Sequence, residues 1–145
     1  MRYLTESFLL GALRRGRRVE QFLGPCGPVE RPGVRYVEVR PKKASYDVVL
    51  HTVEDAGHEG FMDLVEFPPL EPDDEANEFG RLLGGTEDPS AALALAEQHT
   101  GAERDRWVNE GLAEAEYGDF VCAGRPWDAS PDGRPWPGRR RSPAP

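Results

Sequence analysis

The segment YDVVLHTV, residues 46–53, decides the fold that this sequence predicts. It contains three valines and a threonine, and such β-branched residues pack well on a pleated, half-buried surface. A turn-forming stretch with two glycines, residues 54–60, separates it from a second apolar segment, residues 61–67. This order predicts that residues 46–53 and 61–67 form a β-hairpin.

Two upstream segments also have the character of strands. In residues 34–40, Val34 and Tyr36 share one face with Glu38, because side chains alternate between the two faces of a strand. Residues 19–23 are a candidate first strand. Together with the hairpin, these segments predict an antiparallel meander of three or four strands.

Three segments, residues 5–15, 89–99 and 101–116, are predicted to be helices. The first begins with Thr5, and the other two follow Asp88 and Thr100; the side chain of each can accept a hydrogen bond from a free N–H group at a helix start. In the third, Glu103 lies three residues after Thr100, which is the spacing of a capping box.

Glycine and proline indicate where regular structure ends. The run GPCGP, residues 24–28, predicts a loop, and residues 124–145 predict a disordered tail that leaves Trp127 and Trp136 exposed. The predicted fold is therefore α+β: an N-terminal helix, the meander and a C-terminal helical pair packed on one face, in a single domain of residues 1–123.

The charge of the chain is unevenly distributed. Residues 45–120 contain twenty acidic residues and three arginines, a formal charge of −17, whereas residues 1–44 carry +6 and residues 121–145 carry +3. A field of one sign attracts opposite charge over distances beyond direct contact. The middle of the chain is therefore expected to attract a basic partner and to repel nucleic acid.

Other features exclude several classes of protein. No apolar stretch approaches the roughly 18–20 residues needed to span a bilayer. The arginines at 14–18 follow the short apolar run at 7–13 instead of preceding it, the reverse of a secretory signal, so a cytoplasmic protein without membrane contact is expected. Its two cysteines would then remain thiols. The arginines at 14–18 and 139–141 are expected to pair, in part, with the protein's own carboxylates.

A row of carboxylates on the predicted 101–116 helix marks the candidate binding surface. Glu103, Glu110 and Glu114 fall within a sector of about 40°, and Trp107 borders them. Carboxylates speed the encounter with a basic protein, and an aromatic side chain supplies a desolvated anchor. The expected partner-binding residues are Asp73, Asp74, Glu75, Glu78, Glu87, Asp88, Glu103, Trp107, Glu110 and Glu114.

The predicted function is that of a small acidic binding protein that engages a basic protein partner. Its most specific form is an inhibitor or immunity protein that covers the nucleic-acid-binding surface of a toxin, with carboxylates standing where phosphates would sit. For any single carboxylate, an ion pair on the helix surface, such as Glu103 or Glu110 with Arg106, remains the simpler interpretation. No catalytic residue, no cofactor and no oligomeric state is predicted.

Two alternatives remain open. The chain could be a small metal-dependent enzyme or metal-binding protein, although the spacing of its candidate ligands matches no dedicated metal motif. It could also be an adaptor that acts through the tail, residues 124–145. The candidate metal ligands are His51, Asp55, His58, Glu59 and Asp63.

Overall fold

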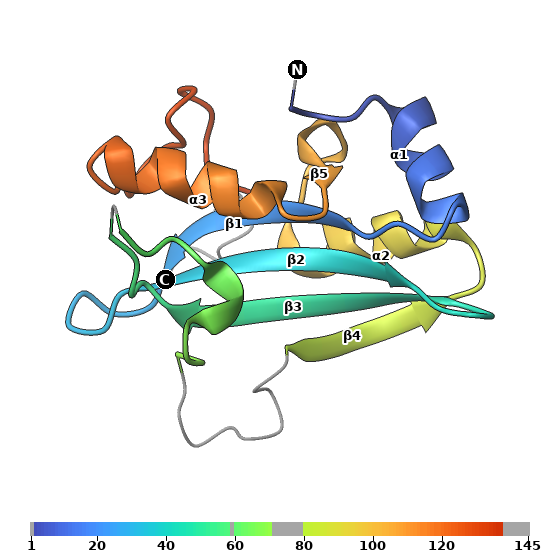
Figure 1. Ribbon diagram of the computed structural model, residues 1–145, viewed down its shortest axis with the longest axis horizontal. Coiled ribbons are helices and arrows are strands. Elements are labelled where there is room, and N and C mark those ends of the chain that lie inside the picture. Colours follow the sequence, from blue (N-terminus) through green and yellow to red (C-terminus); the bar gives the residue numbers. More distant parts are fainter. Residues whose placement is uncertain (1, 59, 71–79, 138–145) are drawn as a thin grey trace.

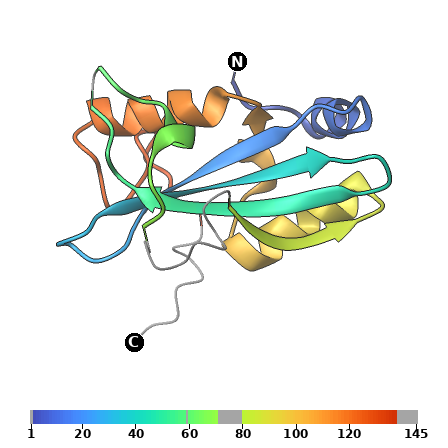
Figure 2. The same ribbon diagram turned by 60° about the horizontal axis from the view of Figure 1, so that its bottom comes forward.

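The computed structural model describes residues 2–58, 60–70 and 80–137, which form an antiparallel sheet with helices on both faces (Figures 1 and 2). The predicted α+β class is confirmed, with five strands in place of three or four. No helix within the described residues combines the length and the apolar character needed to cross a membrane. The elements in chain order are α1 (Glu6–Arg14), β1 (Val19–Cys26), β2 (Gly33–Pro41), β3 (Tyr46–Glu54), η1 (Leu64–Glu66), β4 (Arg81–Thr86), α2 (Pro89–Thr100), η3 (Arg104–Arg106), β5 (Val108–Asn109) and α3 (Leu112–Cys122).

The five strands lie in the order β4-β3-β2-β1-β5, and every neighbouring pair is antiparallel. In the central pair, Tyr36 lies opposite His51, and Glu38 lies opposite Val49 on β3 and Glu20 on β1. This register places Glu20, Tyr36, Glu38 and His51 on one face of the sheet, because alternate residues of paired strands share a face. α3 and η1 lie over this face, and α2 covers the other (Figure 2). The expectation that the two C-terminal helices pack on one face is therefore wrong.

The predicted hairpin between residues 46–53 and 61–67 is wrong. Residues 61–67 pass over the sheet and include the short 3-10 helix η1, and the apolar side chains Leu64 and Phe67 are buried against the sheet face. The edge of β3 is instead paired with β4, which the sequence did not suggest. Apolar content alone does not distinguish a segment that lies on a sheet from one that joins it.

The predicted helix over residues 101–116 is also wrong. Gly101 adopts a left-handed conformation with φ 80° and ends α2. The side-chain amide of Gln21 then accepts a hydrogen bond from the Glu103 N–H at 2.8 Å and donates one to the Glu103 carbonyl at 2.9 Å. These bonds hold the segment along β1, where β5 joins the sheet. The next α-helix begins only at Leu112.

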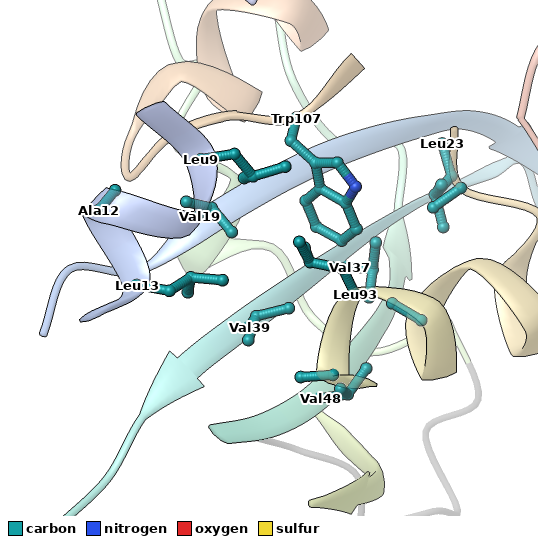
Figure 3. Packing of buried hydrophobic residues seen from close by; sticks show 13 residues of the cluster. Leu9, Ala12, Leu13, Val19, Leu23, Val37, Val39, Val48, Leu93 and Trp107 are labelled. Carbon is teal, nitrogen blue, oxygen red and sulfur yellow. The ribbon is translucent and has the colours of Figure 1, made fainter. Parts of the chain in front are cut away.

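One hydrophobic core fills the space between the sheet, α1 and α2. Trp107 lies at its centre, against Leu9 of α1, Leu93 of α2 and Val37 of β2 (Figure 3). The indole is 0% exposed. Trp107 is therefore a core residue, and the expectation that it borders an exposed acidic row is wrong.

A second core lies on the opposite face, under α3. Phe120 of α3 packs on Phe22 of β1, and Trp136 contacts both rings, with centroids 5.7 Å and 5.5 Å away. Gly24, at φ 96°, lies under the indole, where a Cβ atom would be 2.5 Å from a Trp136 ring carbon. Residues 24–26 thus belong to β1 and not to the predicted loop. The expectation that Trp136 is exposed is wrong, whereas residues 138–145 of the predicted tail lie outside the described residues.

Candidate functional site

Two neighbouring cavities on the α3 side of the sheet share the lining residues Tyr36, Leu64 and Val65. Their volumes are about 140 and 150 Å³. We call the two cavities together the groove. The first, its acidic end, is also lined by Glu20, Asp63, Gly111, Ala113 and Glu114. The second, its mixed-charge end, is also lined by Arg18, Glu38, Arg40, His51, Val53 and Phe67.

Glu20 brings a carboxylate from β1 to the acidic end. Its Oε1 atom accepts hydrogen bonds from the N–H groups of Gly111 at 2.9 Å and Ala113 at 3.3 Å. The carboxylate thus caps α3, because Gly111 has no side chain that could do so. Burial raises the pKa of Glu20; the two N–H groups oppose this rise, while the nearby carboxylates of Glu38 and Glu110 add to it.

Asp63 and Glu114 form a pair of carboxyl groups at the acidic end. Asp63 precedes η1 and Glu114 lies in the first turn of α3, so residues 51 positions apart in the chain meet here. Burial raises the pKa of Glu114, and the charge and side-chain hydrogen bond of Asp63 raise it further.

Tyr36 lies where the two cavities meet. The residue is only 3% exposed, and its ring stacks on the imidazole of His51 with centroids 4.4 Å apart and an angle of 8° between the planes. Burial raises the pKa of Tyr36, and the nearby carboxylates of Glu38 and Glu20 raise it further, so the hydroxyl stays protonated.

The mixed-charge end is built around Glu38, whose side chain is buried. Arg40 forms an ion pair with the Glu38 carboxylate, and the His51 Nε2 atom lies 3.6 Å from its Oε1 atom. Burial alone would raise the pKa of Glu38, but the neighbouring His51 and Arg40 outweigh it and lower that pKa. Glu38 is therefore ionised, and the charge of Arg40 balances it. The described residues that line the acidic end of the groove include no such basic side chain.

The predicted acidic row on one helix does not exist. Glu103 precedes η3 and forms ion pairs with Arg134 at 2.5 Å and Arg106 at 3.5 Å. Glu110 pairs with Arg18 at 3.5 Å, beside the groove. Of that row, only Glu114 contributes a lining side chain to the groove.

The other predicted partner-binding residues are spread over the chain. Asp88 caps α2 through a hydrogen bond from the Ala91 N–H at 2.9 Å, and Glu87 is exposed beside it, outside the groove. Asp73, Asp74, Glu75 and Glu78 lie outside the described residues.

The described residues that flank this acidic segment are both attached to β3. The Leu70 N–H donates to the Thr52 carbonyl at 3.1 Å. Gly80 packs so closely on β3 that a Cβ atom there would lie 2.5 Å from Val49 and 2.6 Å from His51.

Arginines from both ends of the chain neutralise part of the acidic middle. Arg2 pairs with Asp119 at 2.6 Å, and Arg125 pairs with Asp55 at 2.9 Å. Of the arginines that were expected to pair in this way, Arg18 does so with Glu110, whereas residues 139–141 lie outside the described residues. The acidic surface expected for residues 45–120 is therefore partly neutralised by arginines from outside that segment.

The predicted metal ligands do not come together among the described residues. Asp55 accepts hydrogen bonds from the Tyr117 hydroxyl at 2.5 Å and from Arg125, and His58 lies in a turn with Phe61. His51 and Asp63 line different cavities of the groove. Glu59 lies outside the described residues, and no group of three metal-binding side chains forms within them.

The structure adds Glu20, Glu38 and Tyr36 to the candidate site. A signal for two of them was present in the sequence, since Glu38 shares a strand face with the apolar Val34 and Tyr36. A charge on such a face is unfavourable unless it is paired or serves a function. The position of Glu20 opposite Glu38 depends on strand pairing, which the sequence did not give.

Comparisons of this chain with family models, with curated proteins and with solved structures found no match. Only the geometry of the groove therefore bears on the function of this chain.

Proposed function

We propose that this chain is a binding protein that accepts a basic side chain of a partner protein at the acidic end of the groove. One observation carries the proposal. The described residues that line this cavity include three carboxyl groups, Glu20, Asp63 and Glu114, and neither an arginine nor a lysine. Elsewhere in the described structure, carboxylates such as Asp119 and Asp55 have arginine partners.

The electrostatics of this cavity favour a cation supplied from outside. The pKa values of Glu20 and Glu114 are raised by burial and by neighbouring carboxylates, so ionisation of either group is less favourable here than in water. A positive side chain would relieve this repulsion, because an opposite charge within about 4–6 Å favours the ionised form. The net charge of −8 would also speed encounter with a basic protein.

The rim of the groove offers apolar contact next to the charges. Val65 of η1 is 76% exposed and lines both cavities. Burial of such a side chain excludes water from the surrounding polar contacts, as in the centre of protein interfaces. The proposed interface thus combines a charged cavity with an apolar edge.

The most specific form of the proposal is inhibition of a toxin that acts on nucleic acid. The carboxylates of the groove would occupy arginine or lysine side chains that otherwise contact phosphates. The small size and acidity of the chain support this form. A purified partner should then lose its binding to nucleic acid when this chain is added in equal amount.

The proposal is tested with three forms of the chain as bait at low salt. The wild type is compared with Asp63→Asn/Glu114→Gln, which removes two charges from the groove, and with Glu30→Gln/Glu87→Gln, which removes two exposed charges outside it. We expect the wild type and the second variant to retain the same basic protein. The groove variant should lose it, and so should the wild type at high salt, because ions screen exposed charges.

Circular dichroism of each bait establishes that the variants are folded. The proposal is refuted if all three baits retain the same proteins. It is also refuted if the protein that depends on Asp63 and Glu114 is not basic.

A further inference from the structure

We propose that the outer edge of β4 binds a second copy of this chain. The two β4 strands run antiparallel across a two-fold axis and join the two five-stranded sheets into one. This interface lies outside the groove, so the proposal does not depend on the proposed function.

β4 is the outermost strand on its side of the sheet (Figure 1). Among the described residues it pairs only with β3, and no backbone hydrogen bond joins it to a described residue outside β3. An edge strand carries a row of N–H and C=O groups on its outer side, which a strand of another chain can pair with. The opposite edge strand, β5, has two residues, whereas β4 has six, so β4 offers the longer edge.

The register of β4 places an exposed leucine and a glycine on the same face of the sheet. Leu82 lies opposite Val49 of β3, and Gly85 lies opposite Asp47. Val49 and Asp47 are alternate residues of one strand and share a face, so Leu82 and Gly85 share it too. The bulge between them adds Leu83, whose side chain packs against the core on the α2 side.

The edge of β4 is therefore complementary to itself in an antiparallel pair. With the two-fold axis between Leu83 and Gly84, Leu82 of each copy lies opposite Gly85 of the other. The Leu82 side chain is 62% exposed in the single chain, and in the pair it covers a residue that has no side chain. Its burial removes apolar surface from water, as in other cross-strand pairs.

The charges at the two ends of β4 favour the same arrangement. Arg81 begins the strand and Glu87 follows it; both are exposed, and neither forms an ion pair with a described residue. In the antiparallel pair, Arg81 lies opposite Thr86 of the second copy and next to Glu87 of the second copy. A parallel pair would instead place like charges together at both ends. Charge complementarity thus selects the antiparallel orientation and a second copy as the occupant of the edge.

The dimer should be weak and in exchange with the monomer. Two six-residue edges bury less surface than the roughly 1,200 Å² of a standard interface, and the net charge of −8 on each copy opposes association. We expect a dissociation constant between about 1 μM and 1 mM.

The proposal is tested by sedimentation velocity of the full chain from about 10 μM to about 1 mM. The wild type should move from the monomer mass of 16.1 kDa towards twice that mass. Leu82→Lys places a charge on the edge and should weaken the dimer at least tenfold. Phe8→Lys is the matched control, because Phe8 is 66% exposed on α1, outside β4, and this variant should dimerise like the wild type.

A charge exchange separates the local ion pairs from the net charge. Arg81→Glu and Glu87→Arg should each weaken the dimer several-fold, and the double variant, whose net charge equals that of the wild type, should restore it. Glu87→Arg is decisive, because it makes the net charge less negative: general repulsion alone would then make this variant dimerise more strongly. Circular dichroism establishes that each variant is folded.

Hydrogen exchange identifies the surface that is buried. In the wild type, alternate amides of β4 should exchange more slowly at high than at low protein concentration, since the outer N–H groups become bonded in the dimer. A chain that stays monomeric at every concentration would overturn the proposal. So would a dimer that Leu82→Lys leaves intact, or one that the double charge variant fails to restore.

Discussion

Removal of the Trp136 side chain should be one of the most destabilising changes in this protein. Trp136 is 3% exposed, its ring packs edge-on against Phe22 and Phe120, and its indole N–H donates to the Pro126 carbonyl at 2.9 Å. The sequence instead predicts Trp136 to be exposed in a disordered tail. Trp136→Ala therefore tests whether residues 124–137 belong to the folded domain.

The magnitude follows from the burial of the indole. An aromatic side chain of this size withdraws about 200 Å² from water, and about 25 cal/mol per Å² gives a loss of about 5 kcal/mol. This is an upper value, because the unfolded chain already buries part of that surface. We expect Trp136→Ala to lower the free energy of unfolding by about 3–5 kcal/mol, the range found for large aromatic deletions in cores.

The assay is urea unfolding followed by far-UV circular dichroism, with Trp127→Ala as the matched control. Trp127 is 41% exposed, so its removal should cost less than about 1 kcal/mol. For an m value of about 2 kcal/mol per M, the midpoint of Trp136→Ala should fall by about 2 M urea. Equal midpoints for the two variants would show that Trp136 does not contribute to the core. If Trp136→Ala does destabilise the protein, the adaptor alternative cannot be tested by deleting residues 124–145, because that deletion would damage the fold.

Three further substitutions test other features of the structure. Gly80→Ala should lower the free energy of unfolding by more than about 2 kcal/mol in urea melts, because the φ of Gly80 is 98° and a Cβ atom there would collide with β3. Gly124→Ala, at φ 86° in open space, should cost only about 1 kcal/mol. Equal costs for the two variants would contradict the close packing of Gly80 on β3. Glu20→Ala should speed amide exchange in the first turn of α3 and cost about 1 kcal/mol, and unchanged exchange would exclude its capping role. Arg134→Gln should raise the pKa of Asp105, which the hydrogen bond from Arg134 lowers. The stability that Asp105 contributes is present above the pKa of Asp105 in the unfolded chain, and it is lost as the pH falls through the lower pKa of the folded protein. The free energy of unfolding of the variant should therefore fall less on acidification than that of the wild type, by about 0.2–1 kcal/mol. An unchanged titration of Asp105 in NMR would contradict the contact with Arg134.

Local interactions explain why part of the fold was predictable. The α2 helix is capped by Asp88 and has Pro89 in its first turn, and both act on neighbouring residues. β2 and β3 are strands at the predicted positions, because their β-branched residues favour a pleated surface and the strands adjoin in the chain. The capping-box spacing of Thr100 and Glu103 was misleading, since Gln21 binds the Glu103 backbone from 82 positions away.

The amino-acid sequence by itself determined the α+β class, the helices at the N-terminus and after Asp88, two central strands and the excess of negative charge. Only the tertiary structure decided which carboxyl groups line a cavity that has no arginine or lysine among its described lining residues. Glu20, Asp63 and Glu114 meet through the order of the strands, the path of η1 over the sheet and the start of α3. These arrangements depend on contacts between distant parts of the chain, whereas sequence patterns report mainly the preferences of neighbouring residues.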